Sequence, residues 1–175
     1  MSTILTRLRP PLPGIVIVQH IPPMFSRLLS ERLNNECALT VKEAATGDIV
    51  QPDHVYIAPG SKHMTLKRYG SQLILHCNPG PPVHSVCPSV DVLFDSVAHE
   101  VGRNACGVLL TGMGKDGAEG LLHMRQQGAH TIGQDEATST VYGMPKAAFE
   151  QGAVETQLPL SAIPAAITNI ARKKP

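Results

Sequence analysis

The sequence predicts an α/β fold: a doubly wound, mostly parallel sheet with helices on both faces and a small hairpin insertion. Strand-like and helix-like segments alternate through the second half of the chain, which is typical of parallel sheets covered on both faces. Polar or Gly-rich loops follow the apolar runs 15–18 and 106–110, as at the strand ends where open α/β proteins place their chemistry. The chain has 175 residues, of which 42% are hydrophobic, so we expect a single domain over residues 1–175.

The first half is predicted to contain short strands around one amphipathic helix. Apolar residues recur at helical spacing after Met24, and Tyr69-Gly70-Ser71 is a turn between two alternating runs. The proline-rich segment 78–88 cannot form a regular element. We therefore expect strands over 15–19, 38–43 and 54–58, a helix over 24–35, and a hairpin over 63–76.

The second half is predicted to repeat strand and helix in strict alternation. Its first helix begins after Ser89, whose hydroxyl is a suitable N-cap, and a later one has Pro145 in its first turn. The last helix ends in basic residues, which favour the helix dipole. The expected strands cover 105–110, 129–133 and 153–157, and the helices that follow them cover 116–127, 144–151 and 161–172.

Composition excludes several classes of protein. The formal net charge is +1, which argues against a general nucleic-acid-binding surface. No apolar stretch approaches the roughly 20 residues that span a membrane, and no secretory signal is evident. The four cysteines lack paired spacing and resemble reduced thiols, so we expect a cytoplasmic protein without membrane insertion and without a nucleic-acid partner.

The loop from Gly112 to Gly117 has three possible interpretations. It matches G-x-G-x-x-G between a strand and a helix, and Asp135 lies where a ribose-binding carboxylate would, so it could bind a dinucleotide. However, the motif lies late in the chain, and Asp116 would place negative charge near the phosphates. The glycines could instead only shape a tight turn, or the loop could present Asp116 for chemistry.

Several segments of the chain match a known family in order, from about residue 12 to residue 160. These segments are Ile15–Phe25, Val55–Met64, Gly80–His84, Pro88–Phe94, Leu109–Gly120, Gln134–Glu136 and Tyr142–Pro145. Through them the chain resembles the catalytic domain of the chemotaxis protein-glutamate methylesterase.

The resemblance implies a serine hydrolase that removes methyl esters from glutamates, and deamidates glutamines, on the cytoplasmic helices of methyl-accepting chemotaxis receptors. It implies that His20 is the general base, that Asp116 orients it, and that the backbone amide of Met113 helps to hold the oxyanion. Triad geometry recurs on unrelated folds in different chain orders, so the order in this family is no obstacle. No cofactor is implied.

The chain departs from the family in its first residues. The family's nucleophile lies in a Ser-Thr-Gly-Gly turn between its first strand and first helix, and here only Ser2-Thr3 echoes that motif, without the glycines. The nucleophile is therefore not identified, and Ser2 is a weak candidate for it. We interpret residues 1–9 as the tail of that helix, with the strand before it and the receiver domain absent, and expect an unpaired edge or gap in the sheet.

Two further hypotheses follow from this departure. The chain could be a methylesterase impaired by the missing serine, or an inactive domain that only binds a receptor. A metal site is not expected, because the eight histidines show no metal-binding spacing. His63 and His84 fall in segments of the resemblance that are expected to flank the cleft, and a structural role is expected for each.

Overall fold

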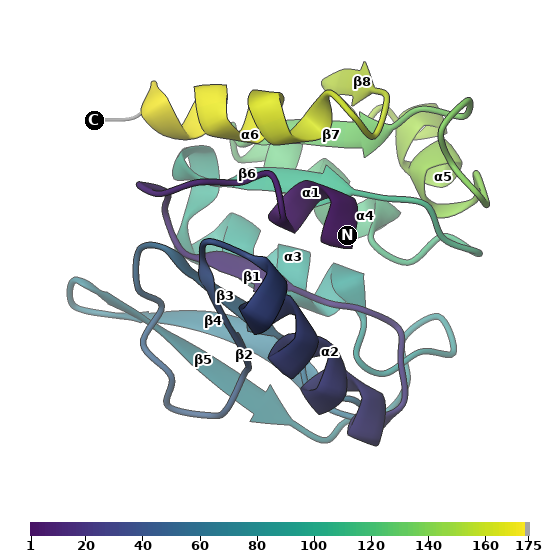
Figure 1. Ribbon diagram of the computed structural model, residues 1–175. Coiled ribbons are helices and arrows are strands. Elements are labelled where there is room, and N and C mark those ends of the chain that lie inside the picture. The colour runs from purple at the N-terminus through teal and green to yellow at the C-terminus, as the bar shows by residue number, and fades with distance from the viewer. Residues whose placement is uncertain (174–175) are drawn as a thin grey trace.

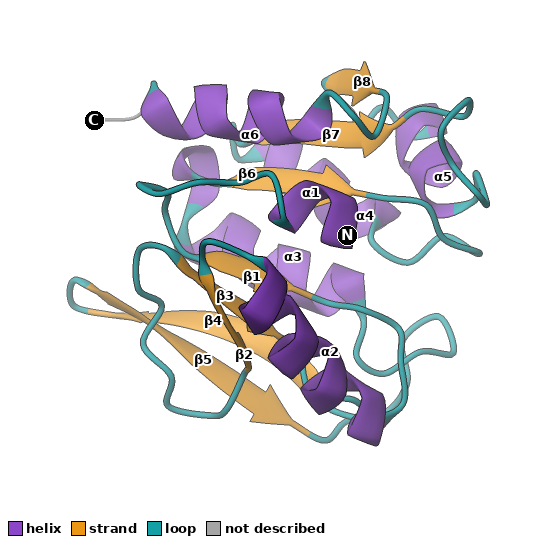
Figure 2. Ribbon diagram, viewed as in Figure 1, coloured by secondary structure: helices purple, strands orange, loops and turns teal. Residues whose placement is uncertain are grey.

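The computed structural model describes residues 1–173 and has the predicted alternation of elements. Figure 1 shows their arrangement and Figure 2 their types. The strands are β1 (Ile15–Ile17), β2 (Thr40–Glu43), β3 (His54–Ile57), β4 (His63–Tyr69), β5 (Gln72–Asn78), β6 (Cys106–Leu109), β7 (His130–Gln134) and β8 (Thr156–Leu158). The helices are α1 (Ser2–Leu5), α2 (Pro23–Glu36), α3 (Val90–Glu100), the 3₁₀ helix η1 (Gly102–Asn104), α4 (Ala118–Gln126), α5 (Met144–Glu150) and α6 (Ile163–Arg172).

The parallel strands lie in two sheets, and the predicted hairpin forms a third. One sheet has the order β1-β3-β2 and the other β6-β7-β8, with every pairing parallel. The hairpin β4-β5 is antiparallel and turns at Gly70, which has a positive φ. In Figure 1 the β6-β7-β8 sheet lies above the β1-β3-β2 sheet, and α6 covers the upper one. The predicted α/β class with a hairpin insertion is confirmed.

The parallel sheet is divided between β1 and β6. Among the described residues, β1 pairs as a strand only with β3, and β6 only with β7. All three residues of β1 are only half-buried, although each of them is apolar. Of the expected edge or gap, the described strands show a gap, because no strand pairing joins β1 to β6. Residues 2–5 are helical, as expected for the tail of a helix, and α1 packs near α6.

The core is aliphatic and lies in two clusters. One cluster joins the hairpin to α3 and α4, and the other joins α1, α2 and the first sheet to α6. The helices α3 and α4 approach closely at Gly120, where a Cβ would come within 2.7 Å of Phe94 Cβ. This close approach brings the first turn of α4 against the first turn of α3, which is where the candidate site lies.

Helix boundaries differ from the prediction where backbone geometry intervenes. α4 begins at Ala118 rather than 116, because Gly117 precedes it with φ +90°. A side chain at Gly117 would also meet Leu109 and Val90, so glycine is required by both backbone and packing. None of the described helices is both long enough and apolar enough to cross a lipid bilayer.

Candidate active site

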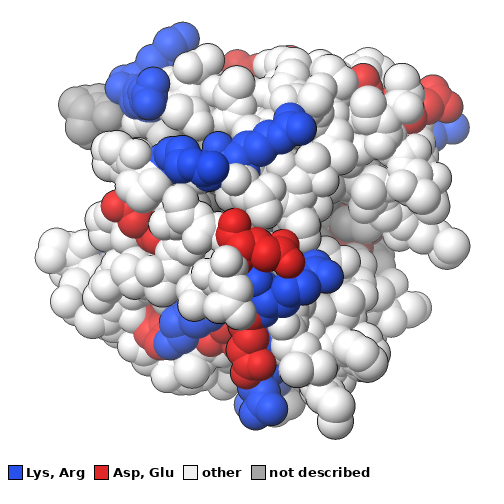
Figure 3. All heavy atoms as spheres, viewed as in Figure 1, with Lys and Arg blue, Asp and Glu red and all other residues white. Residues whose placement is uncertain are grey.

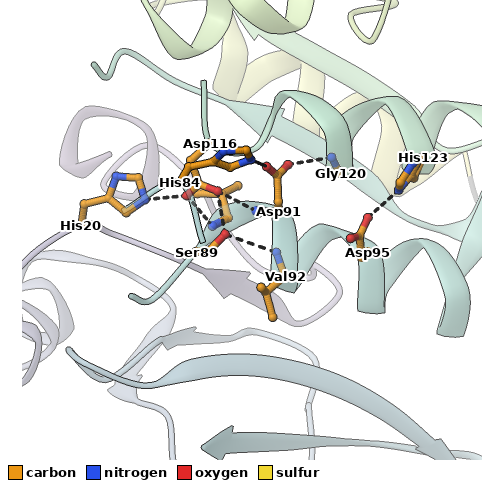
Figure 4. A network of polar contacts seen from close by, with 10 residues as sticks. His20, His84, Ser89, Asp91, Val92, Asp95, Asp116, Gly120 and His123 are labelled. Atoms are coloured by element: carbon orange, nitrogen blue, oxygen red, sulfur yellow. Dashed lines mark hydrogen bonds and ion pairs between the residues drawn. The ribbon is translucent and has the colours of Figure 1, made fainter. Parts of the chain in front are cut away.

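His20 and Asp116 come from loops that follow β1 and β6, and the structure brings them together. His20 Nε2 lies 2.7 Å from Asp116 Oδ2, within the 2.6–3.2 Å expected of a catalytic hydrogen bond. The Asp116 side chain is 4% exposed and that of His20 is 27% exposed. The predicted contact is therefore present, between a buried carboxylate and an imidazole that solvent can reach, as Figure 4 shows.

The Asp116 carboxylate is held by four donors. Besides His20 Nε2, Oδ2 accepts the Val90 N–H at 2.7 Å, and Oδ1 accepts the Ser89 hydroxyl at 2.6 Å and the Asp91 N–H at 3.1 Å. Two of these are backbone amides at the start of α3, where helix N–H groups lack partners within the helix. The positive end of the α3 dipole also favours a carboxylate at this position.

This environment lowers the pKa of Asp116. Burial by itself raises that pKa, but the hydrogen bonds from His20 and Ser89 and from the Val90 and Asp91 amides lower it by more. Asp116 is therefore held as a carboxylate. It fixes the orientation of the His20 ring and would stabilise the imidazolium formed when His20 takes a proton.

The contact also defines which nitrogen of His20 can act as a base. Because Nε2 faces a carboxylate, the neutral ring carries its proton on Nε2, and Nδ1 has the free lone pair. In the familiar Ser-His-Asp arrangement the two nitrogens have the opposite roles. Among the described residues, no group hydrogen-bonds His20 Nδ1, so this atom is available to a nucleophile or to water.

The loop after β6 is braced so that Met113 projects outward. The Gly112 N–H donates to Val141 O at 3.1 Å, and the Met144 N–H donates to Gly112 O at 2.8 Å. A Cβ at Gly143 would overlap this loop's backbone, so glycine is needed for the close approach. Met113 is 82% exposed, and no described residue accepts a hydrogen bond from its amide. That N–H is therefore free for an oxyanion.

The structure does not favour the dinucleotide interpretation of this loop. The Asp135 carboxylate accepts hydrogen bonds from the amide and hydroxyl of Thr138, three residues away, instead of facing the glycine loop. Asp116 points into the protein toward His20, and a Cβ at Gly112 would overlap Met144 Sδ. The glycines serve packing and turn geometry, and the loop presents Asp116.

No described hydroxyl hydrogen-bonds His20. The Ser89 hydroxyl donates to Asp116, and the Ser2 hydroxyl accepts from Arg32 at 3.3 Å on the exposed side of α2. Ser2 therefore remains a weak candidate for the nucleophile. Ser89 is the predicted N-cap of α3, and its hydroxyl accepts the Val92 N–H at 3.5 Å. Its second role, as a hydrogen-bond partner of Asp116, was not predicted from the sequence.

The predicted flanking residues His63 and His84 lie at the same end of α3. His63 Nδ1 accepts the Ser89 N–H at 3.2 Å, and its Nε2 donates to Pro81 O at 2.9 Å, so it fixes the proline-rich loop against the helix start. His84 Nε2 lies 3.0 Å from Asp91 Oδ2, a contact that no sequence pattern indicated. Burial raises the pKa of Asp91, against the opposing effect of the Gly120 and Gly117 amides.

Comparisons with known proteins indicate the family of this chain. A family model described as CheB methylesterase matches residues 1–167. A Syntrophomonas wolfei protein named protein-glutamate methylesterase/protein-glutamine glutaminase 2 is 56% identical over 151 residues, which cover 86% of this chain and 44% of that protein. A Syntrophotalea carbinolica protein of the corresponding name is 52% identical, over 91% of this chain and 45% of the relative.

The solved catalytic domain of Thermotoga maritima CheB methylesterase has a similar fold, with a TM-score of 0.94 and 37% sequence identity. The match covers 97% of this chain and 90% of that domain. The chain spans about half the length of the curated relatives it matches. From its sequence and its fold together, this chain belongs to the CheB methylesterase family.

Proposed function

We propose that this site hydrolyses methyl esters of glutamate side chains, and deamidates glutamines, on the cytoplasmic helices of methyl-accepting chemotaxis receptors. The observation that carries the proposal is the 2.7 Å contact between His20 and a buried Asp116 that is fully hydrogen-bonded. The names of the similar proteins support the reaction class. The reaction would take place in the cytoplasm, where these receptor helices lie.

In this mechanism His20 is the general base and Asp116 is the positioning residue. A nucleophile oxygen attacks the ester carbonyl while His20 Nδ1 takes its proton, and the imidazolium is stabilised by Asp116 through Nε2–H. The Met113 N–H would donate to the developing oxyanion. His20 then gives the proton to the methoxy group, which leaves as methanol, and water hydrolyses the acyl intermediate by the same route.

We propose that the nucleophile is a serine in a turn before α1, as the family resemblance implies. Within residues 1–173 no hydroxyl is hydrogen-bonded to His20, and β1 and β6 each pair as strands on one side only. A strand added between them would bring a following turn to the same end of the sheet as His20 and Asp116. The 175-residue chain by itself is then expected to retain only activated-water catalysis.

The test measures methanol release from methylated receptor by three proteins. They are the 175-residue chain, the chain extended at Met1 by a strand and a Ser-Thr-Gly-Gly turn, and the extended chain with that serine changed to alanine. We expect turnover only in the second. A triad lacking one member keeps about 10³–10⁴-fold over the uncatalysed rate, so traces in the others are allowed.

Two results would contradict this proposal in different ways. Full turnover by the 175-residue chain would mean that the nucleophile lies within it and has been misplaced. Receptor binding by the extended protein without any turnover would favour the alternative, an inactive receptor-binding domain.

We propose no nucleic-acid partner, because acidic and basic side chains are interspersed on the face that Figure 3 shows and the net charge is near zero.

A further inference from the structure

A second cluster of charged side chains lies beside the candidate active site, on the other side of the α3 start. His84 from the proline-rich loop, Asp91 from α3 and Glu119 from α4 each place one possible ligand atom within 4.8 Å of the other two. Figure 4 shows His84 facing Asp91, with Gly120 of α4 behind the carboxylate. Three segments distant in sequence therefore converge here, and the candidate mechanism uses none of these side chains.

Asp91 has an oxygen that the protein leaves without a hydrogen bond. The residue is 5% exposed, and its Oδ1 accepts the Gly120 N–H at 2.7 Å. Among the described residues, no group donates a hydrogen bond to Oδ2, which is buried and directed toward His84. A buried polar atom without a hydrogen bond is rare and unfavourable, so a cation bound beside His84 would satisfy this oxygen.

The distance from His84 does not amount to a hydrogen bond. His84 Nε2 and Asp91 Oδ2 are 3.0 Å apart, but the oxygen lies away from the direction in which the ring nitrogen would donate. The surface pair His130 and Glu155 offers a comparison, because its atoms are also 3.0 Å apart and do form a hydrogen bond. The two pairs differ in alignment and not in separation.

Ligands of one metal ion have the geometry of the His84 pair. Two donor atoms that each lie about 2.1 Å from an ion point at the ion rather than at each other, and they are about 3.0 Å apart around an octahedral ion and about 3.4 Å apart around a tetrahedral one. A neutral imidazole with two carboxylates is a donor set for zinc and similar divalent transition metals. His84 and Glu119 are exposed, so water can complete the coordination.

We propose that His84, Asp91 and Glu119 form a binding site for a divalent transition-metal ion, for which Zn²⁺ is the probe. His84 and Glu119 line one hollow, which Lys115 and His123 also line. His123 Nδ1 is engaged by Asp95 at 2.6 Å and is not among the ligands. The ion would tie the proline-rich loop to α3 and α4, which together hold Asp116.

The role of this ion is structural, and the proposal is independent of the methylesterase activity. The three ligands lie on segments that position Asp116: the Asp91 backbone N–H donates to Asp116, and Glu119 follows it by three residues. No hydrogen bond or ion pair joins the side chain of any of these ligands to His20, whose side-chain partner is Asp116. The inference departs from the expectation of no metal site, which rested on the absence of a spaced motif, because these ligands meet only through the tertiary fold.

The test is calorimetric titration of the 175-residue chain, free of metal, with Zn²⁺ alone, and with Mg²⁺ for comparison. Two variants remove ligands without disturbing the backbone. His84→Asn keeps a residue that tolerates the left-handed conformation of position 84, where φ is 48°, and Glu119→Gln keeps the side-chain shape. The matched controls are His130→Asn, which removes the aligned surface pair, and Cys87→Ser, which removes the thiol nearest in sequence.

We expect one Zn²⁺ per chain, no measurable Mg²⁺ binding, and affinity at least about tenfold weaker in each ligand variant, since even indirect partners of a metal site matter by that factor. The controls should bind Zn²⁺ normally. Co²⁺ at the same site should give no thiolate charge-transfer absorption. Absence of Zn²⁺ binding, or binding that survives His84→Asn and Glu119→Gln, would overturn the proposal and leave His84 and Asp91 as a proton-linked ion pair.

Discussion

Two His–Asp pairs lie at the start of α3, and they differ in how completely the protein satisfies them. In the first, His20 and Asp116 are 2.7 Å apart and every lone-pair direction of the carboxylate faces a donor. In the second, His84 and Asp91 are 3.0 Å apart and one buried carboxylate oxygen has no hydrogen bond. The two pairs therefore differ in what they can do: the first orients a general base, and the second is able to bind an ion.

The two carboxylates also differ in the direction of their pKa shifts. Hydrogen bonds overcome burial at Asp116 and lower its pKa, whereas burial dominates at Asp91 and raises its pKa. Asp116 accepts hydrogen bonds from His20, Ser89 and two backbone amides at the helix start, whereas the Asp91 carboxylate accepts the Gly120 amide at 2.7 Å. The number of donors that face each buried carboxylate, and not the residue type, therefore sets the direction of its pKa shift.

The largest expected effect is a loss of turnover when the pair of His20 and Asp116 is disrupted. In the extended, serine-containing protein, Asp116→Asn should lower methanol release by about 10⁴-fold, because an asparagine favours the wrong tautomer of His20. The exposed pair of Asp95 and His123 offers a control, since Asp95→Asn removes a carboxylate 2.6 Å from His123 and should leave turnover unchanged. Near-normal turnover of Asp116→Asn would show that the contact has no catalytic role.

The same variant should also be less stable, which the sequence alone does not predict. The asparagine amide group would face a backbone N–H of α3 in place of an acceptor oxygen. Leaving such a donor unpaired costs about 1–3 kcal/mol of unfolding free energy. Circular dichroism of the folded variant is therefore needed before its turnover is interpreted.

The next largest effect is on stability, through Zn²⁺ binding at the pair of His84 and Asp91. At Zn²⁺ concentrations about 100 times Kd, the metal should raise the free energy of unfolding by about 2.7 kcal/mol and Tm by about 5–10 °C. The His84→Asn variant should show no such shift in a thermal melt. An equal shift in His84→Asn and in the parent chain would place the ion elsewhere on the folded protein.

Ser89→Ala links the two pairs and should have a moderate effect. The change removes both the N-cap of α3 and a donor to Asp116, and loss of such a cap costs about 1–2 kcal/mol. Urea unfolding measures this, with Ser71→Ala in the exposed hairpin turn as a control expected within about 0.5 kcal/mol of the parent. Equal stability of the two variants would remove Ser89 from the network.

The smallest effects are opposite pH dependences of stability. The lowered pKa of Asp116 contributes stability above its unfolded pKa, and that stability is lost as pH falls through the folded pKa. The raised pKa of Asp91 has the reverse effect, favouring the fold at low pH and losing that contribution as pH rises through the folded pKa. Unfolding free energies across acidic pH should therefore change in opposite directions for Asp116→Asn and Asp91→Asn, and parallel curves would contradict the assignment.

The sequence by itself determined the order and type of the elements, because apolar periodicity and turn residues are local properties. The hairpin turn at Gly70 and the helix start at Ser89 follow from that signal, and the described structure confirms them. It also placed His20 and Asp116 at the ends of two strands, and parallel strands bring their ends to one edge of a sheet. The contact between them was predictable for that reason.

Only the tertiary structure decided which side chains satisfy one another. The Asp116 carboxylate meets Ser89 and two α3 amides because the Gly120 approach sets the spacing of α3 and α4. His84, Asp91 and Glu119 converge through a loop and two helices with no shared spacing in the chain. The separation of β1 from β6 also depends on which strands pair, and that is decided by the tertiary structure. Hydrogen-bond direction depends on atoms that distant segments place within a few ångströms, and local periodicity contains no information about that placement.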